Sequence, residues 1–133
     1  MSCTKRTDEL SFPVEPTITL DSISQDTLIE FQDKLILHLS YQDGDGDLGT
    51  SNPDINSIFV QDSRLENADE YYLPPLAPEN STISIQGTFD VELSTTFLLG
   101  NGDEESTIFS LFLKDRAGNE SNTVETAEIF IVR

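Results

Sequence analysis

Short runs of alternating apolar and polar residues, divided by turn-forming residues, restrict the fold of this sequence more than any other feature. In residues 34–41, KLILHLSY, every second side chain is Leu or Tyr, and in residues 88–94, TFDVELS, Phe89, Val91 and Leu93 alternate with polar residues. A period of two places the apolar side chains on one face of a β-strand. Comparable runs predict further strands at residues 17–23, 55–62, 106–115 and 126–132.

The segments between these runs have the composition of turns. DGDGDLG, LPPLAPENS, GNGDEES and DRAGNESN are rich in Gly, Pro, Asn and Asp. Residues 21–33 come closest to a helical pattern and have room for one short turn, and a shorter strand is expected at residues 71–73 or 82–85. We therefore predict an all-β fold, an immunoglobulin-like antiparallel β-sandwich of about seven strands over residues 16–133.

The charge of the chain narrows the classes of partner. The 133 residues include 25 acidic and 7 basic side chains, which gives a formal net charge of −18. Such a chain repels phosphate backbones and attracts cations, so we expect no nucleic-acid partner. The longest apolar runs, such as IFIV at residues 129–132, are far shorter than the roughly 20 residues of a membrane-spanning helix.

The single cysteine, Cys3, lies in a charged segment, and residues 1–15 are predicted to form a flexible tether. One cysteine cannot form an intrachain disulfide. Two interpretations stay open: an exposed thiol near a frayed terminus, or a cysteine that carries a lipid after removal of a signal peptide.

The stretch YQDGDGDLG carries most of the chemistry, because Asp43, Asp45 and Asp47 alternate with glycines. Calcium takes six to eight oxygen ligands, and aspartates at every second position can turn several carboxylates inward. The stretch matches the first half of a helix–loop–helix calcium loop, but the sixth position is Leu48, the twelfth is Asp54 instead of Glu, and no helices flank it.

We therefore expect a calcium loop of another kind, between strands. Its ligands would be the carboxylates of Asp43, Asp45, Asp47 and Asp54 and the carbonyl of Gly49. The open alternative is a polar connection in which Asp and Gly serve turn geometry alone.

The loop DRAGN joins the last two predicted strands and would lie at the same end of an immunoglobulin-type sandwich. Asp115 and Asn119 are therefore predicted to supply outer metal ligands. An ordinary turn is the alternative, with Gly118 in the left-handed conformation, and Arg116 could neutralise the aspartates in place of a metal.

Other residues favour binding over catalysis. His38 is the only histidine and falls within a predicted strand, so triads that need a histidine base find no support and we expect no enzyme.

Tyr71 and Tyr72 could form a stacking platform, which gives an alternative function as a glycan- or peptide-binding accessory module. The other interpretation of these tyrosines is an edge strand with one ring buried. The acidic NGDEES, residues 101–106, is expected to be a solvated turn at the end opposite the aspartate loop.

Several blocks together resemble a known group of proteins. Cys3 near the start, LSYQDGDGDLG, SIFVQDSR, YYLPPLAP, ISIQGTFDVEL and IFSLFLKDRAGNESNTVETAEIFI are similar to small secreted lipoproteins of Bacteroidota-type bacteria with an immunoglobulin-like domain. The resemblance implies a lipid on Cys3, membrane contact through that lipid, and a location in the cell envelope, at the outer membrane or cell surface. The expected function is a non-enzymatic interaction or structural module, with a protein or glycan partner.

Overall fold

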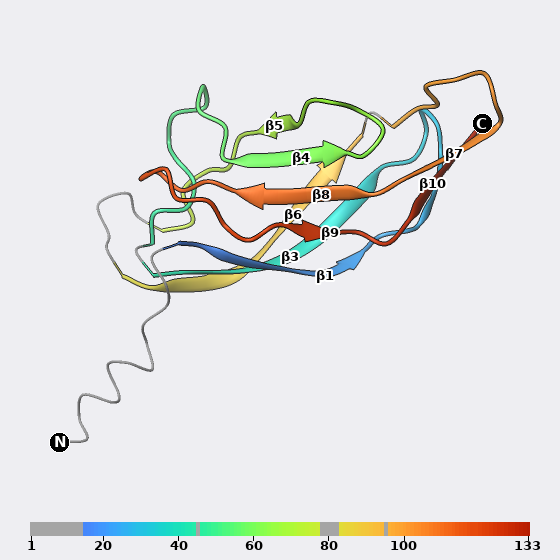
Figure 1. Ribbon diagram of the computed structural model, residues 1–133. Coiled ribbons are helices and arrows are strands. Elements are labelled where there is room, and N and C mark those ends of the chain that lie inside the picture. The colour runs from blue at the N-terminus through green and yellow to red at the C-terminus, as the bar shows by residue number, and fades with distance from the viewer. Residues whose placement is uncertain (1–14, 45, 78–82, 95) are drawn as a thin grey trace.

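The computed structural model describes residues 15–44, 46–77, 83–94 and 96–133, and within these ranges the chain forms strands, turns and loops without a helix (Figure 1). The all-β prediction is confirmed. No segment of these ranges is a helix long and apolar enough to cross a membrane. The strands of the described ranges are β1 (Thr17–Ile23), β2 (Thr27–Ile29), β3 (Leu35–Asp43), β4 (Ile58–Asp62), β5 (Asp69–Tyr71), β6 (Ile85–Leu93), β7 (Glu104–Thr107), β8 (Phe109–Leu113), β9 (Val124–Glu125) and β10 (Ile129–Val132).

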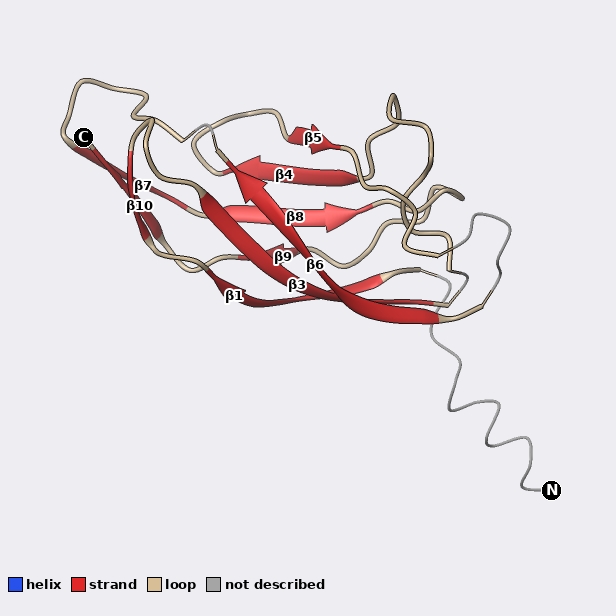
Figure 2. Cartoon of the chain, turned by 180° about the vertical axis from the view of Figure 1, so that it is seen from behind, coloured by secondary structure: helices blue, strands red, loops and turns tan. Residues whose placement is uncertain are grey.

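The strands form three sheets in a sandwich-like arrangement. The two larger sheets have the orders β1-β3-β6 and β5-β4-β8-β9, and a smaller sheet has the order β2-β10-β7. All pairings are antiparallel except that of β2 with β10. The two larger sheets lie one above the other in Figure 2, and their inward side chains belong to one hydrophobic cluster.

The core follows the alternation of the sequence. On β3, Leu35, Leu37 and Leu39 are almost completely buried, and Tyr41 is buried beside them. β3 pairs with β6, and β4 pairs with β8 in the opposite sheet. Each fully buried Leu or Ile contributes on the order of 1.5–3 kcal/mol relative to an exposed position. The other core side chains of β4, β6, β8 and β10 are Ile58, Val60, Val91, Leu93, Phe109, Leu111, Leu113, Ile129 and Ile131.

The structure has ten strands in its described ranges where the sequence predicts about seven. The run at 106–115 is divided, because β7 pairs with β10 while β8 pairs with β4 in another sheet. The change of sheet falls at Ile108, which is 40% exposed between the buried Thr107 and Phe109. The segment 21–33 contains β2 followed by a turn at residues 30–32.

A side-chain amide protects the outer edge of β1. The Ile18 N–H donates to Asn122 Oδ1 at 2.8 Å, and Asn122 Nδ2 donates to the Ile18 carbonyl at 2.9 Å. The amide therefore replaces the peptide group of a neighbouring strand, and an open strand edge is the part of a sheet most prone to unwanted pairing. Because Asn122 lies just before β9, this clamp also joins the two larger sheets.

The connections gather at two opposite ends of the molecule. The loop after β3 and the loop between β8 and β9 lie at one end, while the loop before β7 and the end of β10 lie at the other (Figure 1). The first end contains the aspartate loop of the sequence.

Candidate metal centre

Three carboxylates from two loops converge at the first end of the sandwich. Asp43 is the last residue of β3, Asp47 lies in the loop that follows, and Asp115 lies just after β8. One carboxylate oxygen from each residue lies within 4.8 Å of the other two. Asp43 is 0% exposed and Asp115 is 5% exposed, and the Oδ1 atom of Asp47 is buried. The group is therefore an internal cluster of acids at the junction of two loops.

The path of the first loop depends on two glycines and one leucine. Gly46 and Gly49 have φ values of 67° and 82°. A Cβ atom at Gly46 would overlap the backbone carbonyl of Ile83, and one at Gly49 would overlap that of Pro74. Only glycine fits at these positions. Leu48 between them is completely buried and anchors the loop in the core.

Arg116 joins the two loops. Its backbone N–H donates to the Asp47 carbonyl at 3.1 Å, and its Nη1 donates to the Gly49 carbonyl. The aspartate loop is also fixed on its other side, because the Thr50 N–H donates to the Leu73 carbonyl at 2.9 Å. The cluster is therefore held from both sides by backbone hydrogen bonds.

Asp115 serves the turn and the cluster together. The Asn119 N–H donates to Asp115 Oδ1 at 2.7 Å, and Asn119 Nδ2 donates to Oδ2 at 3.2 Å. The Asp115 N–H donates to the Asn119 carbonyl, and Gly118 has a φ of 94°. The turn predicted for DRAGN is present, and the same aspartate reaches Asp43 and Asp47.

The structure brings together part of the predicted ligand set. Asp43 and Asp47 are in the cluster, and Asp115, predicted as an outer ligand, belongs to the same inner group. Asp45 lies outside the described residues. Asn119 acts on the cluster through its hydrogen bonds to Asp115.

Of the other two predicted ligands, Gly49 contacts Arg116 and Asp54 lies away from the cluster. The Gly49 carbonyl accepts the hydrogen bond from Arg116. Asp54 is exposed in a turn, where its N–H donates to Asn52 Oδ1 at 3.0 Å, and it is not part of the group of three carboxylates.

Mutual repulsion of the carboxylates is one term in the electrostatics of the cluster. Two unit negative charges at 4.8 Å repel by about 3.5 kcal/mol at an effective dielectric constant of about 20. The Asp47 N–H donates to Asp43 Oδ2 at 2.8 Å, which offsets part of one pair. Carboxylates are hard oxygen ligands and suit Ca²⁺, Mg²⁺ or Mn²⁺. A pocket of about 420 Å³, whose lining includes Lys114, Asp115 and Arg116, borders the cluster at Asp115.

The remaining predicted positions within the described residues fall outside this centre. Tyr71, in β5, is half-buried, and burial together with the charge of Asp69 raises its pKa. Tyr72 is 38% exposed beyond the end of β5. Cys3 lies outside the described residues. His38 Nδ1 lies 2.7 Å from Asp90 Oδ1 on the outer face of its sheet.

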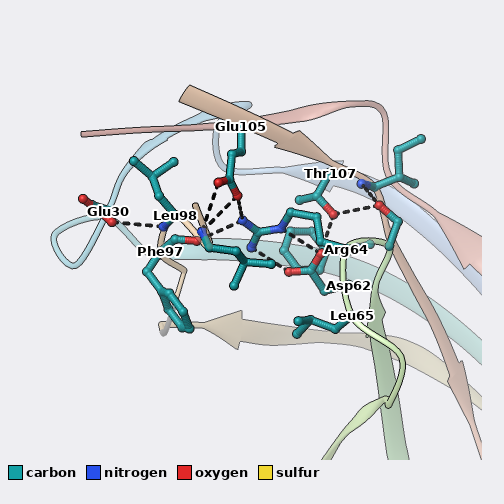
Figure 3. A network of polar contacts seen from close by, with 12 residues as sticks. Glu30, Asp62, Arg64, Leu65, Phe97, Leu98, Glu105 and Thr107 are labelled. Carbon is teal, nitrogen blue, oxygen red and sulfur yellow. Dashed lines mark hydrogen bonds and ion pairs between the residues drawn. The ribbon is translucent and has the colours of Figure 1, made fainter. Parts of the chain in front are cut away.

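A second polar cluster, at the opposite end, was missed by sequence reasoning (Figure 3). Arg64 contacts Asp62 at 2.8 Å and Glu105 at 2.7 Å. The solvated turn expected at residues 101–106 covers only residues 101–103, because β7 begins at Glu104. Glu105, in that strand, is half-buried. Arg64 and Glu105 are 41 residues apart, so no local pattern joins them.

The two carboxyl groups of this cluster are held in their charged form. Burial acts to raise the pKa of Asp62, but hydrogen bonds from Arg64 and Thr107 and the charge of Arg64 outweigh it and lower the pKa below its usual value. The backbone N–H groups of Leu99 and Gly100, followed by Arg64, lower the pKa of Glu105. The cluster is therefore a permanent ion-pair network at neutral pH.

Comparison with known proteins returned no match, whether the chain was compared with protein-family models, with curated proteins or with solved structures.

Proposed function

We propose that this chain is a non-enzymatic, lipid-anchored domain of the cell envelope, in which Asp43, Asp47 and Asp115 hold a calcium ion. The ion would join the loop after β3 to the loop after β8 and make this end of the domain rigid. The observation that carries the proposal is the convergence of three carboxylates from two loops within 4.8 Å of one another. The domain would serve as an interaction or structural module.

Calcium fits this set better than a smaller ion. It accepts six to eight oxygen ligands in irregular geometry, whereas magnesium demands a near-ideal octahedron. Three carboxylates provide the charge, and Asp45, next to the cluster in sequence, is the proposed fourth. Water entering from the neighbouring pocket would complete the shell. A chain with a net charge of −18 also concentrates cations at its surface.

The order of the strands supports an immunoglobulin-like class. The sheet β1-β3-β6 corresponds to strands A, B and E, and the sheet β5-β4-β8-β9 corresponds to C′, C, F and G. In that correspondence the aspartate loop is the B–C loop, and residues 114–123 are the F–G loop. These two loops lie at the same end of an immunoglobulin fold, as the three carboxylates require.

The location at the envelope is proposed from Cys3 and from the resemblance to bacterial lipoproteins. Metabolic labelling with an alkyne fatty acid in a Bacteroidota host, using the full precursor, tests it. The label is expected on the wild-type chain and absent from Cys3→Ser, and an unlabelled wild-type chain would contradict the anchor.

Thermal unfolding in calcium and in chelator tests the metal site. A ligand that binds only the folded state at a hundredfold excess over its Kd stabilises it by about 2.7 kcal/mol. For a chain of 133 residues this corresponds to a rise of roughly 8–12 °C in Tm. Identical melting curves in millimolar calcium and in chelator would refute the proposal, and calorimetry is expected to give one ion per chain.

A further inference from the structure

A pocket of about 210 Å³ lies at the second polar cluster, because Asp62 and Arg64 are part of its lining. Leu65, Phe97 and Leu99 form part of its apolar wall, and Asp69 and Thr96 also line it. Tyr71, which the sequence singles out as a ligand platform, lines this pocket too, whereas Tyr72 does not. The pocket therefore combines apolar walls with charged and hydroxyl side chains.

Charged side chains hold the wall of the pocket in place (Figure 3). Arg64 Nη1 donates to the Phe97 carbonyl at 2.9 Å. The Glu105 carboxylate accepts the N–H of Leu99 at 3.0 Å and that of Gly100 at 2.7 Å. Because Arg64 and Glu105 are also paired with each other, the loop that carries Phe97 and Leu99 is organised before any partner arrives, which reduces the entropy lost on binding.

An exposed aromatic pair continues the wall onto the surface. Phe31 is 77% exposed, Phe97 is 39% exposed, and their rings stack at 6.0 Å with 7° between their planes. Phe31 has a φ of 64°, and among the described residues it is the only non-glycine with a positive φ. A large side chain that is strained and exposed contributes little to the core, and such outliers gather at binding sites.

Among the described residues, Thr96 leaves one buried hydroxyl group without a hydrogen-bond partner beside the pocket. Its side chain is 4% exposed, and within the described ranges its Oγ1 has no hydrogen-bond partner. Buried hydroxyl groups nearly always have such a partner. Thr96 lines the pocket, so this unsatisfied hydroxyl belongs to a residue of the pocket wall.

The charge of the pocket selects the kind of partner. Asp62, Arg64 and Asp69 line it, so two carboxylates face one guanidinium, and Asp69 forms no ion pair with the described residues. A second copy of the chain also has a net charge of −18, so the two copies would repel each other. A lysine side chain matches the pocket, because its apolar stem suits the walls and its ammonium group has three donors for carboxylate and hydroxyl oxygens.

We propose that this pocket and the Phe31–Phe97 pair form a docking site for a basic segment of a partner protein, with one lysine side chain inserted into the pocket. The stem lies against Leu65 and Leu99, and the ammonium group faces Asp69. The site lies at the other end of the domain from the three aspartates and does not depend on the calcium proposal.

A random peptide library displayed on phage, selected on the immobilised chain, provides the probe. Enriched peptides are expected to carry a lysine beside apolar residues and, as labelled synthetic peptides, to bind with micromolar Kd in fluorescence anisotropy. Replacing that lysine by norleucine keeps the stem and removes the charge, and is expected to weaken binding at least about tenfold. Binding is expected in calcium and in chelator alike. No enrichment over the bare support would overturn the proposal.

Matched variants locate the site. Asp69→Asn and Phe97→Ser are expected to weaken the peptide at least about tenfold. Glu125→Gln, an exposed strand acid elsewhere, and Ile55→Ser, an exposed apolar residue at the opposite end, are expected to leave the Kd unchanged. Equal binding by Asp69→Asn and wild type would overturn the assignment.

A further variant separates binding from folding. Phe31→Gly relieves the positive φ, so its Tm is expected not to fall while peptide affinity is lost. A lower Tm with unchanged affinity would contradict the role of Phe31. A dimer seen by sedimentation velocity and abolished by Phe97→Ser would reassign the surface to self-association.

Discussion

The substitution Asp43→Asn tests the aspartate cluster, because its effect on Tm is expected to differ in sign with and without calcium. Asp43 repels two other carboxylates at distances within 4.8 Å, about 7 kcal/mol for the two pairs at an effective dielectric constant of about 20. The asparagine oxygen can still accept the Asp47 N–H, with a loss of roughly 1–2 kcal/mol for the missing charge. If the reduced repulsion stabilises the fold by even about 2 kcal/mol after this loss, Tm is expected to rise by several degrees in chelator.

In saturating calcium the difference in Tm between Asp43→Asn and wild type is expected to change sign or to disappear. The wild type gains about 2.7 kcal/mol at a hundredfold excess over Kd, whereas the variant lacks one of three charged ligands and binds more weakly. The assay is thermal unfolding followed by circular dichroism, for both chains, in chelator and across a calcium titration.

Asp54→Asn is the matched control. Asp54 is exposed and outside the cluster, so its calcium-dependent rise in Tm is expected to equal that of wild type. If Asp43→Asn is destabilised by the same amount in chelator and in calcium, groups of the protein, such as Arg116, already balance the carboxylates, and the reasoning from repulsion is refuted.

Two further changes test the fold around the two ends. Gly49→Ala forces a Cβ into the Pro74 carbonyl at a φ of 82° and is expected to destabilise the chain by roughly 2–5 kcal/mol in urea unfolding; an unchanged midpoint would contradict the described path of the loop. Asp62 has a folded-state pKa below its unfolded value of about 3.9, so its pairing with Arg64 stabilises the fold above that pH and is lost as the pH falls through the folded pKa. The unfolding free energy of Asp62→Asn is expected to fall less steeply than that of wild type below about pH 4, and parallel slopes would show that the pair contributes nothing.

The strands were predictable because their signal is local. Alternation with period two depends on neighbouring residues, and Leu35, Leu37 and Leu39 lie in the core as it predicts. The last run was partly misjudged: a strand was predicted over residues 126–132, but β10 begins only at Ile129, and Ala127 before it is exposed.

The ligand set was predicted less well, because counting along a loop assumes that the chain continues around one ion. Leu48 is buried and Thr50 bonds to Leu73, so the chain leaves the cluster after Asp47 and carries Asp54 into solvent. Asp115 comes into the inner group through the pairing of β8 with β4, which no single segment reveals.

The Asn122 clamp on Ile18 bears on how the domain carries mechanical load. The chain enters β1 at Thr17 and leaves β10 at opposite ends of the molecule (Figure 1). A pull between these points acts along the axis of β1, so the pairs between β1 and β3 must slide together instead of opening one by one. The clamp grips the other edge of β1 and must break in the same event. A domain tethered before β1 and drawn by a partner at the far end would therefore meet force in shear, the direction in which a sheet resists most.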